Sequence, residues 1–146
     1  MKAALIAFVF VGLVAVGLPT VHALRYEAFQ ITGNFYESLH TCILHGGYLV
    51  AIETPTQNVK VMEAIKKLGG NGPWWTSGTD FGMEGAWMWL SRHKAMGAIN
   101  GYTNFETGRP VFSTSGGDNC IAIYKTGLWR DVPCNSRLSF VCEFTF

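Results

Sequence analysis

Residues 120–142, CIAIYKTGLWRDVPCNSRLSFVC, decide the fold, because they carry three of the four cysteines of the chain. The fourth is Cys42, so two disulfides require the C-terminal region to return to the N-terminal part of the sequence. Four cysteines allow three pairings, and spacing alone leaves all three open. A bridge closing a loop of about 100 residues would stabilise the fold by about 4–5 kcal/mol, and one of about 15 residues by about 3 kcal/mol.

The N-terminus has the features of a secretory signal peptide. Lys2 precedes an apolar run over residues 3–18, and Val21-His22-Ala23 matches a small-x-small cleavage signal. The run is shorter than the roughly 20 residues that a membrane-spanning helix needs, which disfavours an N-terminal anchor. We therefore expect a signal peptide at 1–23, one mature domain at 24–146 and a secreted, extracellular product. In that oxidising compartment disulfides are favoured over zinc ligation, and the sequence has no CxxC pair.

Composition and charge exclude several classes of protein. Of the 146 residues, 14% are aromatic and 14% are charged, which does not fit a disordered or fibrous chain. Cleavage removes Lys2, so the 11 basic residues fall to 10 and balance the 10 acidic ones. Nucleic-acid binders and polybasic membrane binders carry a basic excess. We expect neither nucleic-acid binding nor membrane insertion.

Capping signals predict two helices in the N-terminal half. Asn34 and Glu37 form a capping box, and the helix that follows them ends at Gly46-Gly47. Residues 54–57, TPTQ, supply a second N-cap with proline at the first helical position, and this helix ends at Gly69-Gly70. The expected buried faces consist of Phe35, Leu39, Cys42 and Ile43 on the first helix and Val61, Met62, Ile65 and Leu68 on the second.

Short aromatic and β-branched segments predict strands around these helices. They occupy residues 26–32, 48–52, 74–76, 86–90, 119–124 and 139–144. The stretch 91–117 lacks periodicity, and a loop of that length in a compact domain is often functional. His93, between Arg92 and Lys94, is interpreted as part of a solvated loop. The expected fold class is α+β, with two helices packed on short antiparallel sheets and a long irregular loop.

Motifs in a fixed order give the chain a resemblance to the C-type lectin-like domain family. Residues 75–80, WTSGTD, resemble the family's W-I-G core motif, and residues 85–89 resemble its next strand. Residues 102–105 approach the long loop, residues 129–131 stand at the W-N-D position, and residues 142–144 are similar to the C-terminal ending. The resemblance covers the mature chain and implies the family's short form, with the disulfides Cys42–Cys142 and Cys120–Cys134. WTSGTD is also similar to secreted single-domain lectins of insects.

The resemblance places a ligand-binding loop around residues 109–131. Sugar binding in this family usually depends on a calcium ion, which needs about 6–8 oxygen ligands. Arg109-Pro110-Val111 stands where the family has E-P-N or Q-P-D, and its proline often follows a cis bond. Arg130 replaces the W-N-D asparagine, whereas the acidic residues of the family are retained as Asp131 and Asp118. A cation about 5 Å from a divalent ion costs on the order of several kcal/mol. We therefore expect an empty primary calcium site, with Arg109 and Arg130 paired to Asp118 and Asp131.

An auxiliary calcium site is implied on the same side of the domain. The candidate ligands are Asp80, Glu84, Asp118 and Asn119. This site keeps more of its oxygen ligands than the primary one, so calcium is expected here if anywhere. The sequence nevertheless favours two solvated acids in a loop over a bound ion.

The resemblance implies carbohydrate recognition by a secreted lectin, directed at glycans or glycoproteins of microbes or host cells, as in innate immunity. Tyr102, Phe105 and Phe112 could stack on a sugar, although packing within the loop explains each of them as well, and Phe105 better. The alternative is a calcium-independent, protein-binding module, such as a salivary or venom-type factor acting on a haemostatic protein or receptor. No catalytic constellation is present, so an enzyme is not expected. The protein should be a monomer or a non-covalent dimer.

Overall fold

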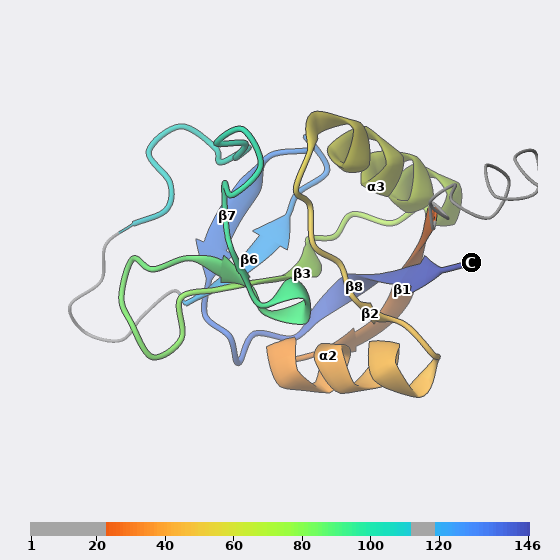
Figure 1. The fold of residues 1–146 in the computed structure, drawn as a ribbon. Helices are drawn as coiled ribbons and strands as arrows, with labels where there is room; N and C mark the ends of the chain where they lie inside the picture. Colours follow the sequence, from red (N-terminus) through yellow and green to blue (C-terminus); the bar gives the residue numbers. More distant parts are fainter. Residues whose placement is uncertain (1–22, 112–118) are drawn as a thin grey trace, which may run out of the picture.

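The computed structural model describes residues 23–111 and 119–146, which form two helices and a mixed sheet (Figure 1). The helical elements are α2 (Phe35–Leu44), α3 (Pro55–Leu68) and the 3-10 helix η1 (Leu90–Arg92). The strands are β1 (Leu24–Gly33), β2 (Tyr48–Leu49), β3 (Trp74–Thr79), β4 (Met88–Trp89), β5 (Lys94–Ala95), β6 (Cys120–Ile123), β7 (Trp129–Val132) and β8 (Leu138–Thr145). This order of elements confirms the predicted α+β class.

Strands β1 and β8 bring the two ends of the described domain together. They pair antiparallel, from Leu24 opposite Thr145 to Gly33 opposite Leu138. α3 lies on one side of this pair and α2 on the other (Figure 1). β3 pairs parallel to β8 and antiparallel to β4 and β6. The expectation of purely antiparallel sheets is therefore wrong at one pairing, because a long connection separates β3 from β8 and allows a parallel return.

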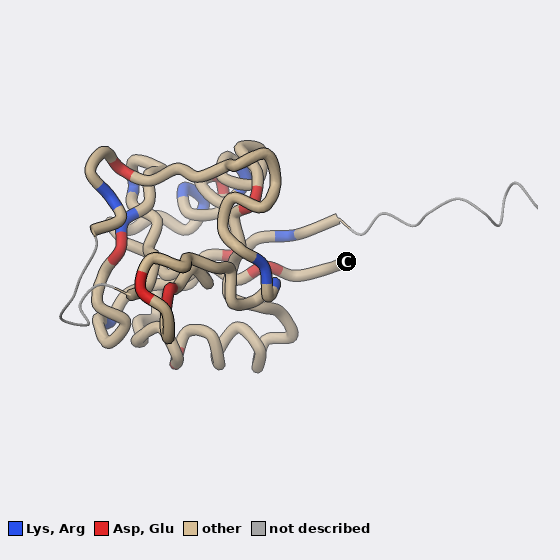
Figure 2. The backbone as a smooth tube through the Cα atoms, turned by 60° about the vertical axis from the view of Figure 1, so that its left-hand side comes forward, with Lys and Arg blue, Asp and Glu red and all other residues tan. Residues whose placement is uncertain are grey.

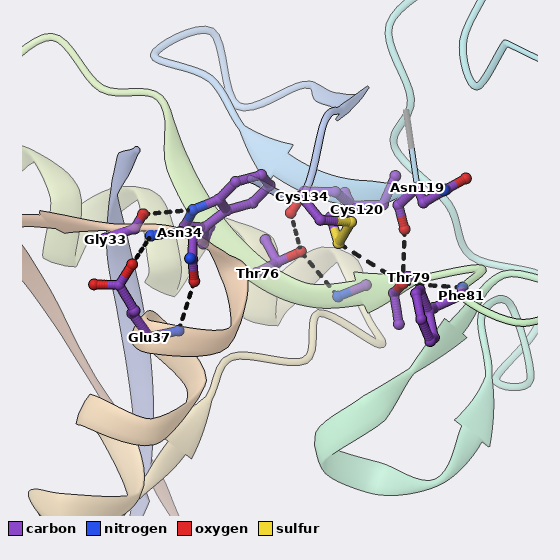
Figure 3. The surroundings of a disulfide bond; sticks show 12 residues. Gly33, Asn34, Glu37, Thr76, Thr79, Phe81, Asn119, Cys120 and Cys134 are labelled. Carbon is purple, nitrogen blue, oxygen red and sulfur yellow. Dashed lines mark hydrogen bonds between the residues drawn. A yellow bond between two sulfur atoms is a disulfide. The ribbon is translucent and has the colours of Figure 1, made fainter. Parts of the chain in front are cut away.

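Both disulfides have the pairing that the family resemblance implies. Cys42–Cys142 joins α2 to β8 across a sequence separation of 100, and Cys120–Cys134 spans 14 residues between β6 and the segment after β7. The first bridge ties the N-terminal helix to the closing strand. The second fixes the entry of β6 against the turn that leaves β7 (Figure 3).

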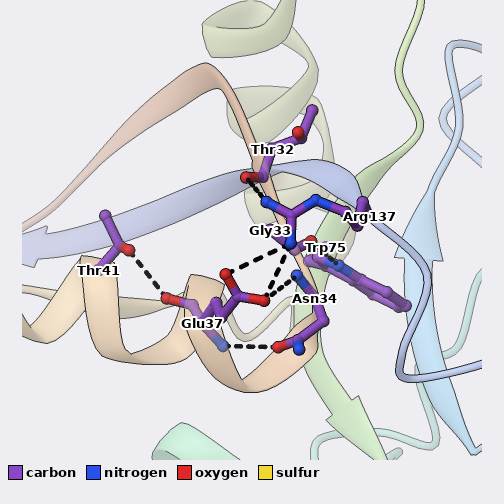
Figure 4. A network of polar contacts seen from close by, with 7 residues as sticks. All are labelled: Thr32, Gly33, Asn34, Glu37, Thr41, Trp75 and Arg137. Atoms are coloured by element: carbon purple, nitrogen blue, oxygen red, sulfur yellow. Dashed lines mark hydrogen bonds and ion pairs between the residues drawn. The ribbon is translucent and has the colours of Figure 1, made fainter.

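The capping signals are confirmed at the start of both helices. The Asn34 side chain accepts from the Glu37 N–H at 2.8 Å, and the Glu37 carboxylate also pairs with Arg137, 3.1 Å away (Figure 4). Thr54 caps α3 by accepting from the Gln57 N–H at 3.2 Å. One predicted core residue is wrong: Ile43 is 50% exposed, and Ser38 is buried in α2 instead. The helix turns its small serine, rather than Ile43, toward Gly33 at the end of β1.

Two predicted strands are shorter than expected, because side chains and turns take the place of their backbone hydrogen bonds to neighbouring strands. Only Tyr48 and Leu49 pair as a strand, although Val50, Ala51 and Ile52 are all buried. The Ala51 N–H donates to the Glu143 carboxylate at 2.8 Å instead of to a neighbouring strand. The strand expected at residues 86–90 is reduced to β4. Leu90, the last residue of the expected strand, begins η1 instead. β7 was not predicted separately.

The core centres on four buried tryptophans, which are Trp74, Trp75, Trp89 and Trp129. Trp129 from β7 packs edge-on against Trp89 at 5.3 Å, and its indole N–H donates to the Asn58 side chain of α3 at 2.8 Å. The Trp75 indole N–H donates to the Gly33 carbonyl at 3.0 Å. These bonds satisfy polar atoms that burial removes from water. The Trp129 bond also holds β7, the strand that carries Arg130 and Asp131, against α3.

Candidate functional site

The tripeptide Arg109-Pro110-Val111 lies in the long loop beside β7. Its Arg109–Pro110 peptide bond is cis, as the resemblance implies. The Arg109 N–H donates to the Glu106 carbonyl, and the Glu106 N–H donates to the Trp129 carbonyl, both at 2.9 Å. This pair of bonds fastens the loop to the strand that carries the W-N-D position.

Asp131 is the acid that the tripeptide encloses. Its side chain is completely buried, with Oδ1 3.2 Å from Arg109 Nη1 and Oδ2 accepting a 2.9 Å hydrogen bond from the Val111 N–H. Protein donors therefore engage both carboxylate oxygens, and one of these donors is a cation. Of the predicted cluster of Arg109 and Arg130 with Asp118 and Asp131, the structure shows the pair Arg109–Asp131.

Arg130 contacts an acid that the sequence did not single out. Its Nε lies 3.0 Å from Glu106 Oε2, and its guanidinium lies 5.1 Å from the centre of the Tyr124 ring. Successive residues of a strand project to opposite faces of the sheet, which separates the side chain of Arg130 from that of Asp131. Asp118, the other predicted partner, lies outside the described residues.

The auxiliary calcium candidates Asp80 and Glu84 lie together in the loop after β3. Asp80 is 2% exposed; its Oδ2 accepts from the Gly85 N–H at 2.9 Å, while its Oδ1 has no hydrogen-bond partner among the residues that the structure describes. Burial, followed by the nearby Glu84 carboxylate, raises the pKa of Asp80. The backbone carbonyl of Asn119 accepts from the Thr79 hydroxyl at 2.6 Å. The side-chain amide oxygen of Asn119 is therefore the atom that could bind an ion. A buried, unpartnered carboxylate oxygen beside a second acid fits a cation ligand.

The remaining auxiliary candidate, Asp118, lies outside the described residues. Within 23–111 and 119–146, no group of three acid, histidine or cysteine side chains is arranged to hold a metal. The described part of the auxiliary site therefore supplies two carboxylates and one amide, fewer oxygens than calcium requires.

A buried ionic cluster under the base of the long loop was missed. Arg92 pairs with Glu143 of β8 through Nη2, and its Nε lies 3.7 Å from Glu53 Oε1. Lys94 Nζ lies 3.8 Å from Glu53 Oε2. Arg92 therefore pairs with two buried acids, whereas His93 and Lys94 are exposed, which agrees with the solvated loop predicted for His93. The available signal was Glu143 itself, an acid inside a predicted strand of apolar residues, because a charge that such a strand buries requires a partner.

This cluster alters the titration of the groups around it. Glu143 is 3% exposed, and burial raises its pKa, against the opposing effects of the Ala51 N–H and Arg92. Burial, with a smaller contribution from Glu143, raises the pKa of Tyr26 to about 12. The cluster joins the entry to α3, β8 and the start of the loop.

The loop aromatics pack on the core rather than forming a sugar platform. The rings of Tyr102 and Phe105 meet the Trp129 indole edge-on, at 5.7 Å and 5.5 Å between centroids. This confirms the packing alternative for Phe105 and extends it to Tyr102. Phe112 lies outside the described residues.

Basic and acidic positions are interspersed along the chain in the view of Figure 2. Beside the tripeptide, Arg109 pairs with Asp131 and Arg130 pairs with Glu106. No helix in the described part of the chain has the length and apolar character needed to cross a bilayer.

Comparisons with known proteins agree with this architecture. Human tetranectin is 30% identical over 129 residues, which are 85% of this chain and 61% of tetranectin. The chain therefore spans about three-fifths of the length of that relative. A mouse scavenger receptor C-type lectin carbohydrate-recognition domain superposes with a TM-score of 0.71 at 23% identity, covering 87% of this chain and 97% of that one. A calcium-independent type II antifreeze protein gives a TM-score of 0.70 at 19% identity, covering 87% and 92%.

The two solved structures show a shared fold. The family model described as the Lectin C-type domain matches residues 31–144, which include both helices and both disulfides. The chain belongs to the C-type lectin domain family.

Proposed function

We propose that this protein is a secreted carbohydrate-recognition module for microbial or host glycans that does not bridge its sugar through a primary calcium ion. The observation that carries the proposal is the state of Asp131, whose two carboxylate oxygens are held by the Arg109 guanidinium and the Val111 N–H. An ion at this position would have to displace both donors. It would also face the Arg109 charge, at a cost on the order of several kcal/mol.

Calcium at the auxiliary position is a separate proposal. Its support is the buried, unpartnered Oδ1 of Asp80 beside Glu84. The test is thermal denaturation with and without calcium: the wild type should be stabilised by the ion, and the variant Asp80→Asn should not. Equal melting temperatures of the wild type with calcium and with chelator would contradict calcium binding here.

A protein ligand is the second candidate function, and exposed apolar side chains on α2 favour it. Ile43 and Leu44 are 50% and 71% exposed, and Tyr48 follows them at 55%. Tyrosine is enriched in protein interfaces, and apolar side chains grouped at a surface can mark an interaction site. The ligand would be a protein such as a haemostatic factor or a receptor, bound without calcium.

A glycan array probed with the secreted chain, with and without chelator, separates these functions. We expect the protein to bind glycans equally well with and without chelator. The variant Asp131→Asn, where it folds, should bind them as well. Binding that chelator abolishes and that Asp131→Asn also abolishes would contradict the calcium-independent mode. Absence of glycan binding would contradict carbohydrate recognition and favour the protein ligand.

A further inference from the structure

A groove of about 540 Å³ lies away from the Arg109-Pro110-Val111 tripeptide. It runs between the start of α2, the loop after β3 and the Cys120–Cys134 disulfide. The side chains that matter in it are Asn34, Tyr36, Phe81, Asn119 and Asn135. We call this feature the α2 groove. Neither Arg109 nor Asp131 lines it, so it is distinct from the family's primary site.

The walls of the α2 groove are held by bonds that do not depend on a ligand. The Phe35 N–H donates to the Cys134 carbonyl at 3.0 Å, which joins α2 to the disulfide. The Thr79 hydroxyl donates to the Asn119 carbonyl at 2.6 Å and accepts from the Phe81 N–H at 3.1 Å (Figure 3). The groove is therefore preorganised, which lowers the entropic cost of binding.

Two aromatic rings and three amides give the α2 groove its chemistry. Phe81 is 69% exposed and Tyr36 is 48% exposed, and their rings meet at 83° with centroids 6.2 Å apart. The amides of Asn119 and Asn135, and the amide nitrogen of Asn34, have no hydrogen-bond partner within the described ranges. Free amides offer both donors and acceptors. Among the residues that the structure describes, no charged side chain lines the groove.

These features select one class of ligand. A pyranose presents a C–H face that an aromatic ring can cover and hydroxyls at its rim that amides can bind. An apolar peptide would bury the amides without partners, which costs free energy. An anion would find no cation in the lining. We propose that the α2 groove binds a neutral hexopyranose unit of a glycan without calcium, an inference that rests on the carbohydrate-recognition function proposed above.

NMR titration of the secreted, ¹⁵N-labelled chain tests the assignment directly. The probes are methyl α-mannopyranoside, methyl β-galactopyranoside and N-acetylglucosamine, each with chelator present. At least one should cause saturable shifts of the Asn119 and Asn135 side-chain amides. Phe81→Ala should weaken that binding about tenfold, the equivalent of about 1.4 kcal/mol. Met83→Ala is the matched control, because Met83 is also 69% exposed in the same loop but does not line the groove.

The outcomes distinguish this site from the broader function. Binding that is lost in Phe81→Ala and kept in Met83→Ala, with unchanged melting temperatures, supports the α2 groove. Binding that Phe81→Ala leaves intact, with shifts around Val111 instead, overturns the groove and leaves carbohydrate recognition standing. If neither these probes nor the glycan array shows binding, both proposals are overturned.

Discussion

Replacing Arg92 by methionine tests whether the buried ionic cluster stabilises the fold. The change removes the partner of Glu143 Oε2 and keeps a side chain of similar length. Among the described residues, Glu143 then retains only the 2.8 Å bond from the Ala51 N–H to Oε1. Breaking one side of a buried ion pair costs about 3–5 kcal/mol. Because the Arg92 side chain is 30% exposed, water moderates this cost, and we expect a loss of about 2–3 kcal/mol near neutral pH.

The stability lost in Arg92→Met should depend on pH, and the pKa of Glu143 sets the direction of that dependence. Burial already raises the pKa of Glu143, and Arg92 is one of the groups that lowers it. In Arg92→Met the pKa therefore rises further. A carboxyl with a raised folded-state pKa contributes stability below its unfolded pKa and loses that contribution as pH rises through the folded value. The deficit of the variant relative to wild type should thus be largest near neutral pH and shrink in acid.

Urea denaturation of both proteins at about pH 7.5 and about pH 4.5 measures the difference. The matched control is the double variant Arg92→Met/Glu143→Gln, which keeps an acceptor for the Ala51 N–H and removes the unpaired charge. It should recover most of the stability lost by Arg92→Met alone. An Arg92→Met deficit that is the same at both pH values, or that Glu143→Gln does not relieve, would refute the reasoning.

Three further predictions concern the cap, the short disulfide and the tripeptide. Asn34→Ala removes the acceptor of the Glu37 N–H and should cost about 1 kcal/mol in urea denaturation, whereas an unchanged midpoint would contradict the role of the cap. Replacing Cys120 and Cys134 together by alanine opens a 14-residue separation and should cost about 3 kcal/mol by the same measurement; a loss below about 1 kcal/mol would argue against an entropic contribution. The triple variant Arg109→Glu/Val111→Asn/Arg130→Asn should gain calcium binding by calorimetry. No gain would show that the loop does not align with the family's tripeptide.

Features encoded by neighbouring residues could be predicted from the sequence. The Asn34/Glu37 box and the Thr54 cap depend on contacts within one helical turn, so the pattern contains them. Both disulfides followed from a family resemblance, because spacing alone left three pairings open. The length of β2 could not be predicted, since it depends on Glu143, 92 residues away from Ala51, taking the backbone donor.

The ionic cluster was missed for the same physical reason. Arg92 and Lys94 flank a histidine in a segment without periodicity, and such a segment is usually solvated. Their acids, Glu53 and Glu143, come from the entry to α3 and from the closing strand. Only the tertiary fold brings these three segments together, although Glu143 stood out as an acid inside a predicted strand of apolar residues.

The tripeptide shows how much of a binding site can be predicted from the identities of its side chains. The lost oxygens at positions 109, 111 and 130 follow from the residue types, and so does the attraction of Arg109 to an acid. The bond from the Val111 N–H to Asp131 does not, because every residue but proline has that donor. It has a consequence for any attempt to restore the ion: removing Arg109 frees only Oδ1, and Oδ2 stays occupied by the backbone. Calcium affinity should therefore require new oxygen ligands at all three positions, enough to reorganise the loop around Asp131, rather than the removal of one charge.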